Sequence, residues 1–396
     1  MKIGEFSDSF LPIVDGVGRV VYMVSDQLAR MNHEVSVIVP MTDMGYRGRF
    51  PFEVIDYCSQ KLPGSQYQAG TPMTDVHFNR MMEMKEFDIV HVHSPFMAGI
   101  AGIDYGKKHS IPMVGTFHSR YYDDFVQISH SKIVAGIGTD LMIRRFYENC
   151  DEVWTPNLSS AKTLESYGYS GAITVMPNGM ELRNISSDQK DLAIRTFHLR
   201  TDLPVLLYVG QINWKKNLGT ILEACAHLKA SGTAFQLVLA GQGPNEREIR
   251  RKCDELSLSE DTVLTGHISE TALLDGLYSA ASIFVFPSLY DTAGLVVSEA
   301  ANAGVPSVTV RGSNAAEVIR ENENGLLCED SASDLFRVLK ENLAVPEHLK
   351  ELGAQAKKTI PVSWELVAKQ MEERYAALIA YRKSESLTFI SPAGSL

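Results

Sequence analysis

The sequence is poor in cysteine and in basic residues. Its 396 residues include five cysteines, which are scattered, odd in number and never spaced as C-x-x-C. This pattern favours neither a disulfide framework nor a zinc site, and a reducing cytosol is the expected location. Lysine and arginine number 37 against 48 acidic residues, for a formal net charge of −11. The charge argues against nucleic acid as a partner, because phosphate backbones bind basic surfaces.

Long apolar runs are also absent. The stretch MKIGEFSDSF has no signal-peptide core, and no apolar run is long enough to span a bilayer. We therefore expect a cytoplasmic protein, and peripheral attachment to the inner face of a membrane is the second reading. The basic residues that favour attachment to an anionic membrane are Lys107, Lys108, Lys132, Arg144 and Arg145.

Short apolar segments alternate with helical patterns along the whole chain. The expected strands are KIGEF, EVSVIV, DIVHVH, PMVGTF, EVWTP and ITVMP in the first half, and PVLLYV, FQLVLA, TVLTG, SIFVFP and VPSVTV in the second. Apolar strands separated by helices are typical of parallel sheets covered on both faces. The predicted fold class is α/β, with two Rossmann-like doubly wound domains.

A turn signal at residues 177–179, Pro-Asn-Gly, predicts the domain boundary. We expect an N-terminal domain over 1–180, a second domain over 181–362, a last helix over 363–383 and a disordered tail over 384–396. Ligands of such sheets bind outside the carboxyl ends of the strands. The expected site is therefore a cleft between two facing domains.

The segment SLYDTAGLVVSEA, residues 288–300, follows the expected strand SIFVFP. A helix starting near Ala293 would point backbone N–H groups at an anion. Glu299 could then accept two hydrogen bonds from the cis-diol of a ribose, and Asp291 could accept from a second polyol. The pattern suits a nucleotide sugar. The alternative is that Asp291 only caps the helix and Glu299 is only solvated.

The chain to about residue 383 resembles the retaining glycosyltransferases of family four, which have the GT-B fold of two Rossmann-like domains facing across a cleft. The matching segments occur in the family's order: DGVGRVV, NHEVSVIVP, DIVHVHSP, GTFHS, VMPNG, YVGQINWKKN, LAGQGP, SLYDTAGLVVSEAANAGVP, NENGLL and a final SW. Residues 118–157 are similar to the diacylglycerol glucosyltransferase branch. The last helix is expected to cross back to the first domain, as in the family.

The resemblance implies roles in binding the donor. Glu299 would hold the ribose, Asp291, where the family usually has Glu, would contact the transferred sugar, and Lys216 would neutralise the diphosphate. The backbone amides that meet the sugar and diphosphate would be those of Thr292, Ala293, Gly294 and Leu295.

Three further positions complete the expected donor site. Gly16 would let the backbone approach the diphosphate, and an ordinary tight turn is the alternative. His118 would lie beside the donor sugar, and the alternative is a packed core histidine. Gln211 stands where the family usually has arginine, and it contributes no charge. The expected catalytic residues are Asp291, His118 and Lys216.

No metal or cofactor is expected beyond the nucleotide sugar as co-substrate. The sequence contains no D-x-D tripeptide, which fits an enzyme that handles diphosphate with lysine and helix dipoles. His91 and His93 alternate on one strand, but no third ligand stands at a convincing spacing. We interpret both histidines as structural.

The acceptor site is expected in the first domain. Phe10, Phe96, Tyr121 and Tyr122 could line an apolar entrance, and Asp123 could orient a hydroxyl. The alternative is that these aromatic residues pack in the core or between domains.

The leading hypothesis is a retaining, metal-independent hexosyltransferase that uses UDP-glucose, with diacylglycerol or another lipid as acceptor. Soluble sugars, polysaccharides and small metabolites are the alternative acceptors. An epimerase or hydrolase of nucleotide sugars is a second class. A non-catalytic nucleotide-sugar binder is a third, motivated by Asp291 and Gln211.

Overall fold

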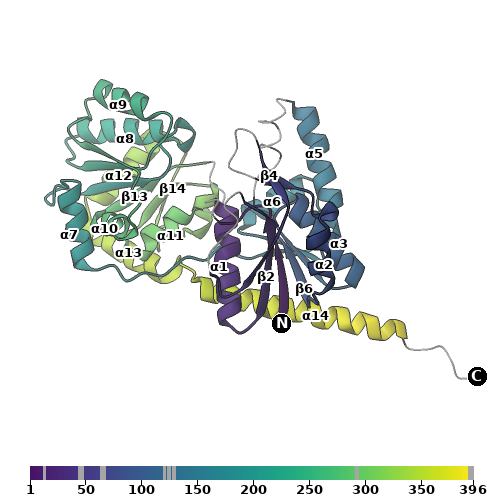
Figure 1. Ribbon diagram of the computed structural model, residues 1–396. Coiled ribbons are helices and arrows are strands. Elements are labelled where there is room, and N and C mark those ends of the chain that lie inside the picture. The colour runs from purple at the N-terminus through teal and green to yellow at the C-terminus, as the bar shows by residue number, and fades with distance from the viewer. Residues whose placement is uncertain are drawn as a thin grey trace, which may run out of the picture. The chain divides into compact units, whose positions relative to one another are not determined.

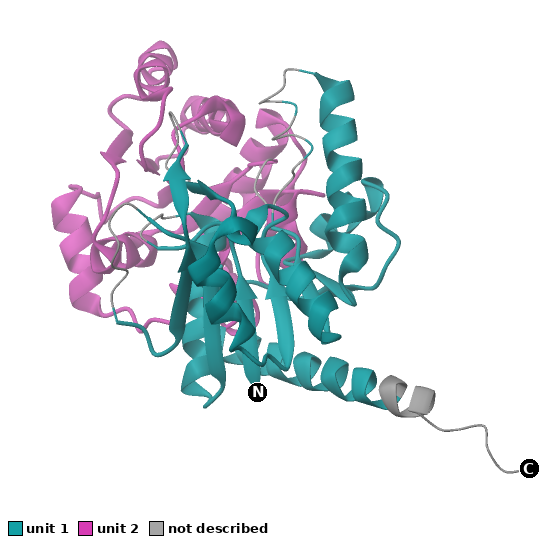
Figure 2. Ribbon diagram, turned by 45° about the vertical axis from the view of Figure 1, so that its right-hand side comes forward, with its two compact units in different colours: residues 1–178, 364–396 teal, residues 179–363 magenta. Residues whose placement is uncertain are grey.

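The computed structural model describes residues 1–11, 15–42, 49–62, 68–118, 122, 126, 131–289 and 294–390, with side chains to residue 384. The chain forms two compact units (Figure 2): unit 1 comprises residues 1–178 and 364–396, and unit 2 comprises residues 179–363. The sequence predicted the domain boundary two residues later, after residue 180.

Unit 1 is built on a seven-stranded parallel sheet in the order β3-β2-β1-β6-β7-β8-β9. Its strands are β1 (Lys2–Phe6), β2 (Glu34–Pro40), β3 (Glu53–Tyr57), β6 (Ile89–Val92), β7 (Met113–Thr116), β8 (Glu152–Thr155) and β9 (Ile173–Val175), and β4 (Ser59–Lys61) and β5 (Gln68–Gly70) form a separate antiparallel pair. The strand order reverses between β1 and β6. Such a switch point opens a crevice at the carboxyl ends of the strands.

The helices of unit 1 come from both ends of the chain (Figure 1). They are α1 (Gly16–Arg30), α2 (Val76–Glu83), α3 (Met97–His109), α5 (Lys132–Arg145), α6 (Leu158–Ser166) and α14 (Trp364–Ile390), with short 3-10 turns η1 (Pro72–Thr74) and η2 (Tyr147–Asn149). The sequence predicted that α14 ends near residue 383, but the helix continues to Ile390. The chain contains no helix-breaking proline between Trp364 and Pro392, so the helical pattern has no reason to stop earlier.

Alternation along β1 and β6 decides which side chains meet which helix. Phe6 and Val92 face α3, since a Cβ on Gly102 of α3 would lie 2.6 Å from Val92 and 2.9 Å from Phe6. His91 points to the opposite face, where its Nδ1 lies 2.6 Å from the hydroxyl of Tyr375 on α14. A strand presents successive residues to opposite faces. The apolar residues therefore pack on α3, and the polar residues lie under α14.

Further contacts hold α14 on unit 1. The Tyr375 ring stacks on Trp154 with centroids 5.2 Å apart, and Arg374 Nε donates to Glu152 Oε2 at 2.7 Å. Arg382 donates to Asp151 Oδ1 at 2.6 Å. Unit 1 is therefore completed by a helix that follows unit 2 in the sequence.

Unit 2 repeats the topology of unit 1 with six parallel strands in the order β12-β11-β10-β13-β14-β15. The strands are β10 (Val205–Val209), β11 (Gln236–Ala240), β12 (Thr262–Gly266), β13 (Ile283–Phe286), β14 (Ser307–Val310) and β15 (Leu326–Cys328). The helices are α7 (Ser187–Thr196), α8 (Leu218–Ala230), α9 (Glu246–Glu255), α10 (Thr271–Ala280), α11 (Leu295–Asn302), α12 (Ala332–Leu343) and α13 (Pro346–Thr359), with 3-10 turns η3 (Trp214–Lys216) and η4 (Asn314–Val318). The switch point here lies between β10 and β13. Within the described ranges of both units, no helix has the length and apolar character needed to cross a membrane.

Candidate functional site

The loops that follow β10 and β11 are in direct backbone contact in unit 2. Gly241 has a φ of +140°, and a Cβ built there would lie 1.9 Å from the carbonyl oxygen of Gly210. Only glycine can occupy this position without moving one loop. The two loops border a pocket of about 220 Å³, lined by Val209, Gly210, Gln211, Ala240, Gly241, Gln242, His267, Ile268 and Leu274. The predicted donor residue Gln211 is exposed at this pocket, and its carbonyl accepts from the Tyr208 hydroxyl at 2.9 Å.

Lys216 is the last residue of the turn η3, which precedes α8. Its neighbour Asn217 has a φ of +62° and donates through its side chain to the Pro287 carbonyl at 3.2 Å and to Asp330 at 2.8 Å. Pro287 directly follows β13. Asn217 therefore ties the turn of Lys216 to the exit of β13, the strand next to β10. Lys216 is half-buried, whereas Lys215 is exposed.

Helix α11 begins on the far side of that exit loop. Gly294 caps it with a φ of +53°, and a Cβ built on Gly294 would lie 3.1 Å from Ala315 Cα. Leu295, the first residue of the helix, is half-buried. The first-turn N–H groups of a helix have no partner inside the helix and carry partial positive charge. The predicted residues Asp291, Thr292 and Ala293 lie outside the described residues.

Glu299 lies in the second turn of α11 and is half-buried. The Tyr278 hydroxyl donates to its Oε2 at 2.9 Å. Burial, followed by the charge of Glu299, raises the pKa of Tyr278 well above its usual value, so this hydroxyl keeps its proton. Next to this pair, Arg183 donates to both oxygens of Asp275, at 2.7 and 2.8 Å. The geometry holds the Glu299 carboxylate in one place, unlike a freely solvated surface residue.

In unit 1, the predicted residue Gly16 is the first residue of α1. A Cβ built on Gly16 would have no atom of the described residues within 4 Å. The N-cap Asp15 accepts from the backbone N–H of Gly18 at 2.7 Å. The start of α1 is therefore ordered by its cap.

His118 ends a buried network at the carboxyl ends of β1, β6 and β7. Its Nε2 lies 3.2 Å from His93 Nδ1, and His93 Nε2 lies 2.6 Å from Glu5 Oε2. His91 Nδ1 lies 3.3 Å from the same Glu5 oxygen, and its Nε2 lies 2.6 Å from the Thr116 hydroxyl. Glu5, His91 and His93 are all at most 1% exposed. Sequence reasoning missed Glu5, although a carboxylate inside an apolar strand was a signal.

Burial and the contacts with the histidines shift the pKa of Glu5 in opposite directions. Burial would raise the pKa of Glu5, but His91 and the hydrogen bonds from His91 and His93 outweigh it and lower the pKa to about 2. Burial, and then the charge of His93, lowers the pKa of His91 to about 4. Burial, followed by His93 and His91, also lowers the pKa of His118 well below its usual value. Near neutral pH, Glu5 is ionised, and His91 and His118 are neutral.

Glu5 supplies the third residue that the sequence did not offer for a metal site with His91 and His93. Their ligand atoms lie within 4.8 Å of one another. The spacing of 2.6 Å between Glu5 and His93 is that of a direct hydrogen bond. Two ligands of one zinc ion, each about 2.0–2.2 Å from the metal, lie farther apart than this. The observed arrangement is a hydrogen-bond network.

The predicted acceptor residues are placed differently from one another. Phe10 is 1% exposed and packs in an aromatic cluster with Phe50 and Phe52, at centroid distances of 5.7 and 6.2 Å. The alternative of core packing thus describes the position of Phe10. Phe96 is 47% exposed at the start of α3. Tyr122 is half-buried, with its ring 6.2 Å from that of Tyr167. Tyr121 and Asp123 lie outside the described residues.

Helix α5 of unit 1 is apolar on two opposite faces. Ala135, Thr139, Met142 and Ile143 are buried against the unit. The other face, which we call the α5 face, consists of Ile133, Val134, Ile137 and Leu141, and all four side chains are exposed. Arg144 and Arg145, both exposed, follow this face at the end of the helix. Exposed apolar side chains at a helical spacing are typical of a surface that contacts something other than water.

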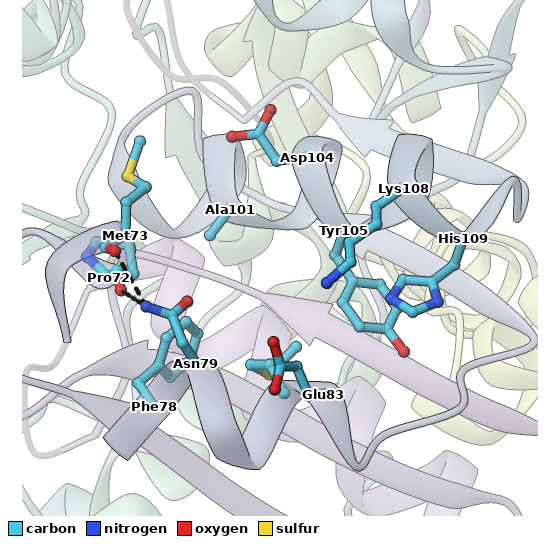
Figure 3. A pocket seen from close by; sticks show the side chains of 11 residues that line it. Pro72, Met73, Phe78, Asn79, Glu83, Ala101, Asp104, Tyr105, Lys108 and His109 are labelled. Carbon is cyan, nitrogen blue, oxygen red and sulfur yellow. Dashed lines mark hydrogen bonds between the residues drawn. The ribbon is translucent and has the colours of Figure 1, made fainter. Parts of the chain in front are cut away.

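A pocket of unit 1 lies between α2 and the C-terminal half of α3 (Figure 3). Its lining consists of Pro72, Met73, Phe78, Asn79, Met82, Glu83, Ala101, Asp104, Tyr105, Lys108 and His109. Helix α3 starts at the carboxyl end of β6 and runs back along the sheet, so this pocket lies toward the amino ends of the strands. None of the residues predicted for the donor or acceptor lines it.

The comparisons with known proteins cover both units. Residues 14–184 match the family model Glycosyltransferase Family 4, and residues 189–359 match Glycosyl transferases group 1. The chain is 25% identical over 392 residues to alpha-monoglucosyldiacylglycerol synthase of Acholeplasma laidlawii, covering 96% of this chain and 98% of that protein. It is 24% identical over 408 residues to GDP-mannose-dependent alpha-mannosyltransferase of Corynebacterium glutamicum, covering 100% and 94%.

Solved structures share the architecture of two parallel-sheet α/β units. Sucrose-phosphate synthase of Thermosynechococcus elongatus aligns with a TM-score of 0.76 at 22% identity, covering 96% of this chain and 99% of that one. This architecture is the GT-B fold.

Proposed function

Because the chain belongs to the glycosyltransferases of family four and has the GT-B fold, we propose that it transfers a hexose from a nucleotide diphosphate sugar to the hydroxyl of a lipid such as diacylglycerol. The first candidate donor is UDP-glucose. The name of the Acholeplasma relative supports glucose and diacylglycerol, and the name of the Corynebacterium relative supports GDP-mannose as the alternative donor.

The observation that carries the lipid acceptor is the α5 face. Its four exposed apolar side chains are followed by two arginines, as in helices that lie in the surface of an anionic membrane. A peripheral enzyme of this kind can take its acceptor from the bilayer without a membrane-spanning segment. We therefore place the proposed reaction at a membrane surface.

In unit 2, the proposed donor site uses the loops after β10 and β13. Lys216 and the first-turn N–H groups of α11 would stabilise the negative charge of the departing diphosphate. Glu299, held by Tyr278, would accept hydrogen bonds from the ribose. Gln211 would add a hydrogen bond but no charge. This proposal needs no metal ion or cofactor beyond the nucleotide sugar.

In unit 1, His118 is proposed to meet the transferred sugar, and Gly16 to leave room for the diphosphate. We propose retention of the anomeric configuration by front-face substitution. The bond from the sugar to the diphosphate breaks while the acceptor oxygen attacks the same face, and the leaving phosphate oxygen takes the acceptor proton. Catalysis would then rest on positioning and electrostatic stabilisation.

The test is release of nucleotide diphosphate from UDP-, GDP- and ADP-hexoses, each with and without diacylglycerol micelles. Release from one donor that rises with the lipid would establish the transfer and the acceptor class together. Release that does not change when the lipid is added would rule out the lipid as acceptor, and soluble acceptors or hydrolysis would remain. Binding of a nucleotide sugar without release would favour a non-catalytic binder.

Two isosteric variants test the assignment of carboxylates. Glu299→Gln should weaken nucleotide binding, because the amide has no charge and only one acceptor oxygen, and its NH2 group would meet a hydroxyl of the ribose or of Tyr278. Asp291→Asn should mainly lower the rate of transfer. Unchanged binding and unchanged turnover in both variants would remove the site from this helix.

A further inference from the structure

The network of Glu5, His93 and His118 connects three neighbouring strands of unit 1. Glu5 lies on β1, His93 directly follows β6, and His118 lies two residues after β7. The two histidine rings are stacked, with centroids 5.4 Å apart and an interplanar angle of 23°. All three side chains lie in one unit, so their arrangement depends only on the fold of unit 1.

Counting protons along the network shows which nitrogen of each ring carries hydrogen. An ionised Glu5 can only accept, so the hydrogen bond of 2.6 Å requires a proton on His93 Nε2. A neutral His93 then has its lone pair on Nδ1. The contact of 3.2 Å from His93 Nδ1 to His118 Nε2 consequently requires that His118 Nε2 donates. A neutral His118 is left with its lone pair on Nδ1.

We propose that Glu5 and His93 are positioning residues that hold His118 with Nδ1 directed to the substrate as a hydrogen-bond acceptor for a hydroxyl group. The proposal deepens the proposed function and rests on it, because it takes His118 as the residue that meets the transferred sugar. His118 Nδ1 has no hydrogen-bond partner among the residues that the structure describes, so it is available for one.

Other groups around the network do not reverse this direction. His91 contacts Glu5 and packs on His93 with ring centroids 4.0 Å apart, but its own nitrogens face Tyr375, Glu5 and Thr116. The Tyr375 hydroxyl lies 3.3 Å from the other oxygen of Glu5. A carboxylate that fixes the tautomer of a histidine through a hydrogen bond is a known device for setting which nitrogen faces the substrate. In this network His93 lies between the Glu5 carboxylate and His118, which is the histidine proposed to contact the substrate.

Adding a second proton to His93 would reverse the direction of the hydrogen bond between His93 and His118. A proton on His93 Nδ1 makes this nitrogen a donor, so His118 Nε2 must accept, and its proton moves to Nδ1. His118 then offers a donor where the substrate hydroxyl needs an acceptor.

The first experiment reads the tautomer directly and does not depend on turnover. Nitrogen-15 labelling of the histidines, with His118→Gln to assign the signal, should show that His118 of the wild-type protein carries its proton on Nε2 at pH 8. A proton on Nδ1 would overturn the proposal, whatever the enzyme transfers. Absence of nucleotide release from every donor would instead count against the proposed function.

The second experiment is kinetic. Glu5→Gln keeps the size of the side chain but replaces an acceptor-only carboxylate with an amide that can accept from or donate to His93 Nε2, so the proton on this nitrogen is no longer fixed. We expect kcat to fall by about 10- to 100-fold, as is typical when a partner behind an active group is lost, with little change in KM. The Nε2-protonated signal of His118 should weaken in the same variant, which a merely structural role of Glu5 would not require.

A double mutant separates positioning from a merely structural role. In the His118→Ala background, Glu5→Gln should lower kcat by less than about threefold, because both changes remove the same interaction. Full additivity of the two losses would overturn the proposal. Glu372→Gln is the matched control, since it removes the carboxylate of another glutamate–histidine pair of unit 1, to His33 Nε2 at 2.9 Å, and should leave kcat unchanged.

Discussion

Units 1 and 2 share a strand order but differ in the chemistry at its switch point. In both units the order reverses between the first and the fourth strand of the main sheet, β1 and β6 in unit 1 and β10 and β13 in unit 2. The strands of unit 1 carry titratable side chains into the core, with Glu5 and His91 buried under α14. In unit 2, β10 and β13 contain no charged residue, and the charged residues predicted for the site, Lys216 and Glu299, lie on η3 and α11.

The difference shows that topology sets the place of a site and side chains set its chemistry. Unit 1 buries a carboxylate because two imidazoles and a tyrosine hydroxyl satisfy it. Unit 2 instead brings the loops after β10 and β11 into close backbone contact through Gly210 and Gly241.

The largest expected effect is on Lys216, which tests whether the chemistry of unit 2 is that of anion binding. Lys216→Ala should lower kcat/KM by about 10²- to 10³-fold, because loss of one preorganised charge partner typically has this size. The midpoint of thermal unfolding should change little. Lys215→Ala, one residue away and exposed, is the control and should change kcat/KM by less than about threefold. Equal losses in the two variants would contradict the assignment.

The next effect is on acid stability, which should separate the two units. The pKa of His91 is lowered to about 4 in the folded protein. Between pH 6.5 and 4, the unfolded chain therefore binds a proton at this histidine that the folded chain does not bind. Unit 1 should lose on the order of 3 kcal/mol between pH 6.5 and 4 from this group. The pKa of Glu5, lowered to about 2, means that its stabilisation is complete above about pH 4.5 and is lost only as pH falls toward 2.

Hydrogen exchange measured at pH 7 and at pH 4.5, and corrected for the intrinsic rate, checks this separation. Protection of β1 and β6 should fall much more than that of β10 and β13. The described histidines of unit 2 are all at least partly exposed, so this unit lacks the same cause. An equal fall in both sheets would show that the buried network of unit 1 does not control its acid stability.

A smaller effect is expected at Gly294, which tests whether backbone conformation holds the site of unit 2. Gly294→Ala should destabilise the unit by about 1–3 kcal/mol, because alanine resists a positive φ and its Cβ would meet Ala315. Gly232, with a φ of +79° and open space around it, is the matched control. Urea unfolding should show a larger loss for Gly294→Ala, and equal losses would mean that the contact with Ala315 is unimportant.

The smallest effect is expected on the α5 face. It tests whether only unit 1 contacts the membrane. Ile137→Glu should weaken binding to vesicles of phosphatidylglycerol and phosphatidylcholine by about five- to tenfold, since it removes a partly immersed apolar side chain. Leu182→Glu adds the same charge at an exposed apolar position of unit 2 and should have no effect. Sedimentation with vesicles measures both, and equal weakening would leave only a general charge effect.

Sequence patterns located most of the elements that form the two sheets. The predicted strands PVLLYV and FQLVLA contain β10 and β11, and the helix expected to start near Ala293 is α11, which begins at Leu295. The edge strands β3 and β15 were missed, because EVIDY and LLC are too short and mixed to stand out from loops. The α5 face was also hidden, since apolar residues on both faces of one helix blur its periodicity.

The sequence by itself determined the fold class and the family, because apolar periodicity and ordered motifs survive without coordinates. It also named His118, Lys216 and Glu299, which stand in such motifs. Only the tertiary structure decided that Glu5 lies behind His118 and that Tyr278 holds Glu299. The physical reason is that these contacts join residues on different strands and helices, and parallel pairing brings together positions that no local spacing relates.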